Sequence, residues 1–250
     1  MDFRWRYPIL SSYSWLDSFA QDHYDLDIDI LIEFHDDAPS QYEWSSRHLN
    51  DLDCPQEVTN RAAALKALMD GGLFIIRGMS YSPMRFGQLI DENELARPIQ
   101  EVDVLVEPFS ATIIKEEFNK LPSQTSFSLV GRYIYQSRYD SLTRGILSFL
   151  GVNGISWVSL FAVKDYMRTG NWTEEQIAHA AGRSKSDVEL FNHTANSPLA
   201  IGPFARHGDK GRLRPKEKMT LVDASRIILP AAQGFIIDRV RSKTFDLTPY

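Results

Sequence analysis

Apolar and polar side chains alternate along the stretch from Asp25 to Phe34, which is the period of a β-strand with one buried face. The other face is mostly acidic. We expect the apolar face to be buried, and it consists of Leu26, Ile28, Ile30 and Ile32. A turn is predicted over residues 36–40, and the residues from Tyr42 to Leu49 predict a second strand.

The pattern becomes helical at Pro55. The spacing of apolar residues predicts a helix over residues 55–70, with proline in its first turn and Gly71-Gly72 ending it. Short buried strands are then expected at residues 73–76 and 102–106. Residues 111–121 begin with the pattern of a strand and continue with that of a helix, so both alternatives stay open.

The second half of the chain follows a predicted linker at residues 122–126 and has helical spacing throughout. Its longest uncharged run lies between Arg144 and Lys164 and has about the length of a bilayer span. The polar residues within the run and the break at residues 151–154 favour two buried helices joined by a turn. We therefore predict no membrane segment.

Capping boxes predict where two later helices begin. Thr173 is followed three residues later by Gln176, and Thr220 is followed in the same way by Asp223. The first of these helices is expected to end at Gly182, and residues 186–192 form another. The last helix should run towards Val240, with kinks at Pro230 and Gly234.

These elements predict an α+β fold, with an N-terminal mixed α/β unit that has a small sheet and a C-terminal all-helical unit. The charges divide in the same way, because residues 1–125 carry about −12 and residues 126–250 about +6. We predict an acidic domain over 1–125 and a basic helical domain over 126–250. The basic domain carries a long loop from His193 to Lys218.

Cysteine use and the acidic residues limit the classes of site. One cysteine, Cys54, excludes an internal disulfide framework and a cysteine-based zinc site. No apolar run follows the first residues, so we expect a cytoplasmic protein without a secretory signal. An acidic row, Asp25, Asp27, Asp29 and residues 35–37, has ligands for a hard cation, but a solvated strand face explains it better. We predict no metal and no cofactor.

Residues 176–191 have the pattern of a DNA-binding helix-turn-helix. Ala178, Gly182 and Val188 lie at the spacing which that motif uses for its helix–helix contact and its turn. Arg183 departs from the pattern, because the motif normally has an apolar residue there. A helix pair with a purely structural role is the alternative interpretation.

The predicted loop from His193 to Lys218 gathers the side chains best suited to chemistry. Two imidazoles can share acid–base work, so His193 and His207 are the candidate catalytic residues. Anion binding is expected from amide and cationic groups, since a guanidinium binds two oxygens of one phosphate or carboxylate. The anion-binding candidates are Asn196, Arg206, Lys210 and Arg212. An ordered loop with solvated charges explains the same residues.

The loop is also expected to fold back on the protein. Leu199, Ile201 and Phe204 are its predicted apolar anchors in the helical core. We expect the polar candidates to gather over the start of the helix at Thr220, namely His193, Asn196, Arg206 and His207.

Four short stretches resemble the C-terminal region of a group of uncharacterised bacterial proteins. They are Trp157-xx-Leu160-Phe161, His193-Thr-Ala-Asn196, Ala205-Arg206-His207-Gly208 and Met219-Thr-Leu-xx-Ala224. Lys218 stands where the group has a proline. The resemblance covers about the last 95 residues and implies that 193–208 form one unit, but it implies no function.

Three functions remain open from the sequence. The leading hypothesis is a non-catalytic accessory protein that works through a protein partner or self-association and through an anion held by the basic loop. The first alternative is a metal-independent phosphodiesterase acting on nucleic acid, with His193, His207 and Arg206 in the site. The second is a DNA-binding regulator that uses the helix-turn-helix. Motifs for nucleotide binding, serine hydrolysis and zinc proteolysis are missing.

Overall fold

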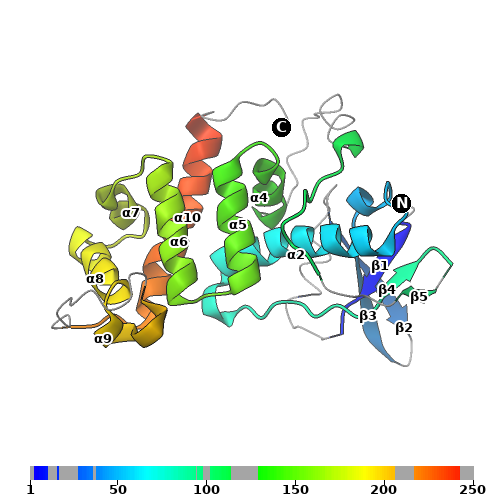
Figure 1. The fold of residues 1–250 in the computed structure, drawn as a ribbon, viewed down its shortest axis with the longest axis horizontal. Coiled ribbons are helices and arrows are strands. Elements are labelled where there is room, and N and C mark those ends of the chain that lie inside the picture. The colour runs from blue at the N-terminus through cyan, green and yellow to red at the C-terminus, as the bar shows by residue number, and fades with distance from the viewer. Residues whose placement is uncertain are drawn as a thin grey trace. The chain divides into compact units, whose positions relative to one another are not determined.

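The computed structural model describes residues 3–10, 16, 28–35, 38–93, 95–97, 102–113, 129–205 and 217–242. The fold is α+β, with an antiparallel sheet formed by residues near the N-terminus and a mostly helical C-terminal region (Figure 1). This fold class is the one predicted from the alternation and spacing of apolar residues.

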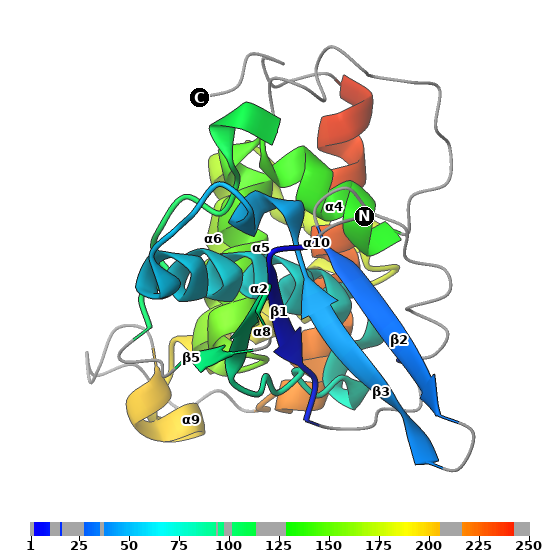
Figure 2. The ribbon, with the colours of Figure 1, turned by 90° about the vertical axis from the view of Figure 1, so that its right-hand side faces the viewer.

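The sheet has five strands in the order β2-β3-β1-β4-β5, and every neighbouring pair is antiparallel. The strands are β1 (Trp5–Pro8), β2 (Asp29–His35), β3 (Ala38–Ser45), β4 (Leu89–Asp91) and β5 (Ala96–Arg97). β2 and β3 pair along most of their length (Figure 2). Tyr7, Trp44 and Phe86 form a ring cluster beside the sheet, with centroids 4.9 to 6.1 Å apart.

The predicted strand and its buried face are confirmed where the structure describes them. Ile28 and Ile30 are buried and Ile32 is half-buried, while Leu26 lies outside the described residues. The second strand begins earlier than predicted, at Ala38, and ends at Ser45. The residues after it form a 3-10 turn, η1 (Arg47–Leu49), because the Ser46 hydroxyl accepts a hydrogen bond from the His48 amide and caps it.

The helix predicted to begin at Pro55 is longer than expected. Helix α2 (Pro55–Arg77) continues through Gly71-Gly72, so the predicted strand at residues 73–76 is wrong. A Cβ atom on Gly71 would lie 2.0 Å from the carbonyl oxygen of Leu147. Glycine is therefore present for a close helix contact rather than for a helix end. The predicted strand at 102–106 is also wrong, because these residues have no regular structure.

The remaining described elements are helical. They are η2 (Gly78–Ser80), α4 (Leu129–Ser137), α5 (Ser141–Asn153), α6 (Trp157–Thr169), α7 (Glu174–Ala180), α8 (Lys185–Ala195), α9 (Pro198–Ile201), η3 (Gly202–Phe204) and α10 (Leu221–Ser242). The uncharged run thus forms two helices, α5 and α6, which lie side by side, with α10 packed against α6 (Figure 1). No helix among the described residues is long and apolar enough to cross a membrane.

The chain divides into two compact units, and neither is continuous in sequence. The first contains the sheet, α2 up to Met69, and α4. The second contains the end of α2 from Asp70, η2 and helices α5 to α10. The single boundary predicted between residues 125 and 126 falls outside the described residues.

Candidate nucleic-acid interface

Helices α7 and α8 are joined by a turn whose geometry depends on Gly182. The Gly182 amide donates to the His179 carbonyl at 3.0 Å, and the Arg183 amide donates to the Ala178 carbonyl at 2.9 Å. Gly182 has φ +62, the left-handed conformation that glycine adopts without steric cost. These two bonds satisfy the last carbonyls of α7 and turn the chain sharply into α8.

Both helices begin at a capping box, which fixes their first turns. The Thr173 hydroxyl accepts from the Gln176 amide, and the Gln176 side chain accepts from the Thr173 amide. The box at Thr173 and Gln176 was predicted, and that at the start of α8, which Ser184 and Asp187 form, was not. The turn and the caps make the helix pair a local consequence of the sequence from Thr173 to Asp187.

The inner faces of the pair are apolar and fully packed. Ala178 and Val188, which the sequence pattern places in contact, are both buried. Phe191 lies near the rings of Trp157 and Phe161 on α6, with centroids 6.0 and 6.1 Å away and the rings nearly parallel. Burial of this aromatic cluster holds α8 against α6, while α6 and α7 both pack against α10.

A polar link joins helices α6, α7 and α8. The carboxylate of Glu174 lies 3.4 Å from the Lys164 ammonium and accepts a hydrogen bond of 2.7 Å from the Asn192 side chain. Lys164 is almost completely buried. Burial lowers the pKa of Lys164, and the neighbouring Glu174 offsets this only in part. The link uses one residue from each helix and orients α8 relative to the other two.

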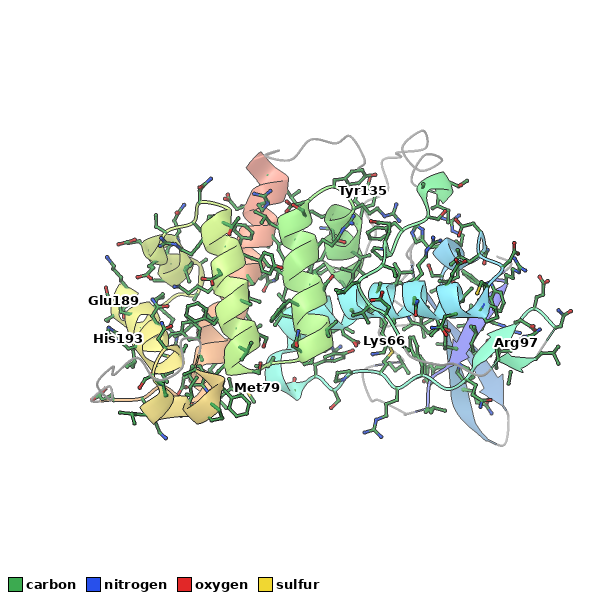
Figure 3. All side chains as sticks on the ribbon, in the orientation of Figure 1. Lys66, Met79, Arg97, Tyr135, Glu189 and His193 are labelled. Carbon is green, nitrogen blue, oxygen red and sulfur yellow. The ribbon has the colours of Figure 1, made fainter. Side chains whose placement is uncertain are left out.

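The opposite face of α8 is exposed. Lys185, Glu189 and His193 are exposed on one side of the helix at i, i+4 spacing, and Ser186 is exposed beside Lys185. Figure 3 shows Glu189 and His193 at the outer edge of α8. Arg183 occupies the position where the helix-turn-helix motif normally has an apolar residue. It is exposed as well and adds a positive charge before the first turn of α8. The backbone amide of Arg183 takes part in closing the turn, through its bond to the Ala178 carbonyl.

The segment predicted to be a long loop begins with helical structure. His193 belongs to the last turn of α8, and the chain continues through α9 and η3 to Phe204. The predicted apolar anchors are wrong for Leu199 and Phe204, which are 63% and 64% exposed. Pro198 begins α9 because proline fits the first turn of a helix, where no amide donor is needed.

The sequence-predicted site residues lie in different environments. His193 is exposed on α8, and Asn196 is the C-cap of that helix, where its side-chain amide donates to the Asn192 carbonyl at 2.8 Å. The other candidates lie outside the described residues, namely Arg206, His207, Lys210 and Arg212. The predicted gathering of His193, Asn196, Arg206 and His207 therefore stays a prediction.

The two ends of the basic segment 206–216 are attached close to the end of α8. Ala205 and Ala195 line the same cavity, and the Met219 amide donates to the Thr194 hydroxyl at 3.1 Å. The described residues on both sides of this segment, Ala205 and Met219, therefore lie close to the end of α8. The sequence pattern gave no signal for Thr194, because its partner is 25 residues away.

Comparison of the chain with protein-family models, with curated proteins and with solved structures finds no match. Within the described part of the chain, no group of three or more histidine, cysteine, aspartate or glutamate side chains is placed to hold a metal ion.

A second polar cluster lies in the first unit, and the sequence analysis missed it. His48 is fully buried, its Nδ1 accepts from the Ser110 amide at 2.9 Å, and its Nε2 lies 3.1 Å from the Arg138 guanidinium. Burial, with the charges of Arg61 and Arg47, lowers the pKa of His48 to about 3. The imidazole is therefore neutral near pH 7, and its role is to tie distant segments together rather than to exchange protons.

Proposed function

We propose that the chain is a non-catalytic DNA-binding protein that places helix α8 in the major groove. The observation that carries the proposal is the turn at Gly182, which joins two capped helices with buried inner faces and leaves one side of α8 exposed. The major groove of B-DNA is wide enough for one α-helix, and the second helix of a helix-turn-helix enters it in this way.

The exposed residues of α8 suit contacts to DNA. Lys185 and Ser186, in the first turn, can donate to phosphate oxygens, and the helix N-terminus adds partial positive charge. Glu189 lies one turn further along and can accept from the exocyclic amine of cytosine. Lys185 is paired with Glu175 at 2.6 Å, but both side chains are exposed, so this pair competes weakly with a phosphate.

The basic segment after η3 would supply the sequence-independent part of the affinity. Residues 206–216 include the proposed anion-binding residues Arg206, Lys210 and Arg212. The described residues on either side of the segment, Ala205 and Met219, lie close to the end of α8. A self-associated pair of chains would present two α8 helices to two half-sites, as such motifs commonly do.

The position of His193 favours this role over the phosphodiesterase alternative. His193 is exposed on the same side of α8 as Lys185 and Glu189. An exposed histidine on the outer face of α8 is suited instead to a contact with the groove.

Charge reversal on α8 tests the proposal. A duplex selected from a random pool should bind with a Kd that rises at least about tenfold in Lys185→Glu, since one lost phosphate contact and a new repulsion act together. Fluorescence anisotropy measures this Kd. Arg85→Glu makes the same change of charge at an exposed residue of the first unit and should change the Kd less than about threefold.

Two results would contradict the proposal. One is a selected duplex that binds wild type and Lys185→Glu equally well. The other is an equal loss in Lys185→Glu and Arg85→Glu, which would show attraction to net charge without an α8 interface. Thermal unfolding of each variant provides the control that both remain folded.

A further inference from the structure

A groove in the second unit has a lining that the proposed function does not use. The end of α2 and η2 form one side of the groove, and α10 forms the other. Its volume is about 360 Å³. This volume falls within the range of roughly 300–1,000 Å³ that is usual for small-molecule sites.

The apolar part of the lining is unusually exposed. Ile76 is 40% exposed, Met79 51% and Val222 41%, while Leu229 beneath them is buried. Single exposed apolar residues are common on protein surfaces, but here three large ones border one concave site. Covering them with an aliphatic chain would remove this surface from water. Methionine adapts its shape to such a chain.

The charged residues in the described lining are cationic. They are Arg77 and Arg226, and no described residue that lines the groove carries a carboxylate. Arg226 approaches Asp223 at 3.5 Å with both side chains more than half exposed, which is a weak pair. The Asp223 carboxylate also accepts a hydrogen bond of 2.6 Å from the Thr220 hydroxyl, so it is engaged in the cap of α10. The guanidinium of Arg226 can therefore turn to an anion in the groove.

We propose that this groove binds an aliphatic carboxylate, such as a medium-chain fatty acid. The alkyl chain would lie on Ile76, Met79 and Val222, and the carboxylate would be held by the guanidinium of Arg226, with the positive charge of Arg77 at the same rim. A guanidinium binds both oxygens of a carboxylate in one plane. A neutral or cationic head group lacks these two charged oxygens and cannot form the same pair of hydrogen bonds. The ligand class follows from an apolar floor combined with a cationic rim. This inference does not depend on DNA binding.

A protein segment is a weaker fit to the same groove. A stable protein interface commonly buries about 800 Å² on each partner, and the apolar area here is confined to a few side chains around one small cavity. The experiment must therefore distinguish binding of a small carboxylate from binding of a second copy or of another protein.

Decanoate is the probe, and the methyl group of Met79 is the reporter. In protein labelled with ¹³C at methionine methyl groups, decanoate should shift the Met79 signal saturably, with Met79→Leu identifying that signal. Arg226→Gln should weaken decanoate binding at least about tenfold, because a charge-assisted pair is lost. Arg241→Gln, an exposed arginine on the same helix outside the groove, should leave it unchanged.

A second pair of variants tests the apolar floor. Val222→Glu should abolish decanoate binding, whereas Val240→Glu, at an exposed valine of the same helix, should not. All five substituted residues are exposed, so the variants should fold. The proposal is overturned if decanol or decyltrimethylammonium binds as tightly as decanoate. It is also overturned if the Met79 signal responds to protein concentration and not to decanoate, which would indicate an interface. DNA affinity is measured separately, so failure of either proposal leaves the other intact.

Discussion

Replacing Asp140 by alanine should lower the free energy of unfolding by about 3–5 kcal/mol, measured by urea denaturation. The carboxylate is 2% exposed and accepts hydrogen bonds from the Arg239 guanidinium at 2.6 and 2.7 Å. It also caps α5 through Thr143, whose amide and hydroxyl both donate to it. Its removal leaves Arg239, which is mostly buried, without its carboxylate and leaves the first turn of α5 uncapped.

Asp223→Ala is the matched control for this substitution. Asp223 also lies at the start of a helix, in the first turn of α10, but its side chain is exposed. Its loss should cost about 1 kcal/mol or less. Similar losses for Asp140→Ala and Asp223→Ala would show that the buried pair with Arg239 adds nothing beyond helix capping.

The same pair predicts a dependence of stability on pH. Burial opposes ionisation of Asp140, but the hydrogen bonds from Arg239 and Thr143 outweigh it, so the pKa lies below its ordinary value of 3.8. A folded-state pKa below the unfolded one stabilises the fold above pH 3.8, and this contribution is lost as the pH falls towards the folded pKa. Wild type should lose stability over this range more steeply than Asp140→Asn.

The second large effect is expected at Gly71. In Gly71→Ala, the added Cβ would meet backbone atoms of Leu147 at 2.0 to 2.7 Å, and a backbone cannot rotate away as a side chain does. Helices α2 and α5 would have to separate locally. We expect a loss of about 3 kcal/mol in the free energy of unfolding, even though alanine favours the helical state.

Gly234→Ala provides the comparison for Gly71→Ala. Gly234 also lies inside a helix, α10, where a Cβ would lie 3.1 Å from the Cβ of Ala180. The gain in helix propensity should nearly offset this tight contact, so the change should stay within about 1 kcal/mol. If thermal unfolding showed Gly71→Ala to be as stable as Gly234→Ala, the close approach of α2 to Leu147 would be wrong.

Local patterns predicted those parts of the fold that depend on neighbouring residues. The alternation at Ile28 and Ile30 identified the strand, and the box at Thr173 and Gln176 identified the start of α7. The spacing around Gly182 indicated the turn of the helix pair. In each case the decisive hydrogen bond or buried face lies within a few residues of the pattern.

The errors came from contacts that are distant in sequence. Gly71 looked like a helix end because the backbone of Leu147 that requires it lies on another helix. The predicted loop at His193 proved to begin inside α8, and Phe204 proved exposed. No local pattern could place the Thr194 hydroxyl against the Met219 amide, which connects the end of α8 to the start of α10.

The dependence of duplex-DNA affinity on salt concentration tests the central claim most directly. If α8 and the basic segment contact phosphates together, the affinity should fall at least about a hundredfold between roughly 50 and 200 mM salt. Replacing Lys210 and Arg212 by glutamine should reduce the slope of log affinity against log salt by about 2. The account would be contradicted by an affinity that does not change with salt concentration or by a slope that is unchanged in the double variant. It would also be contradicted if no selected duplex bound.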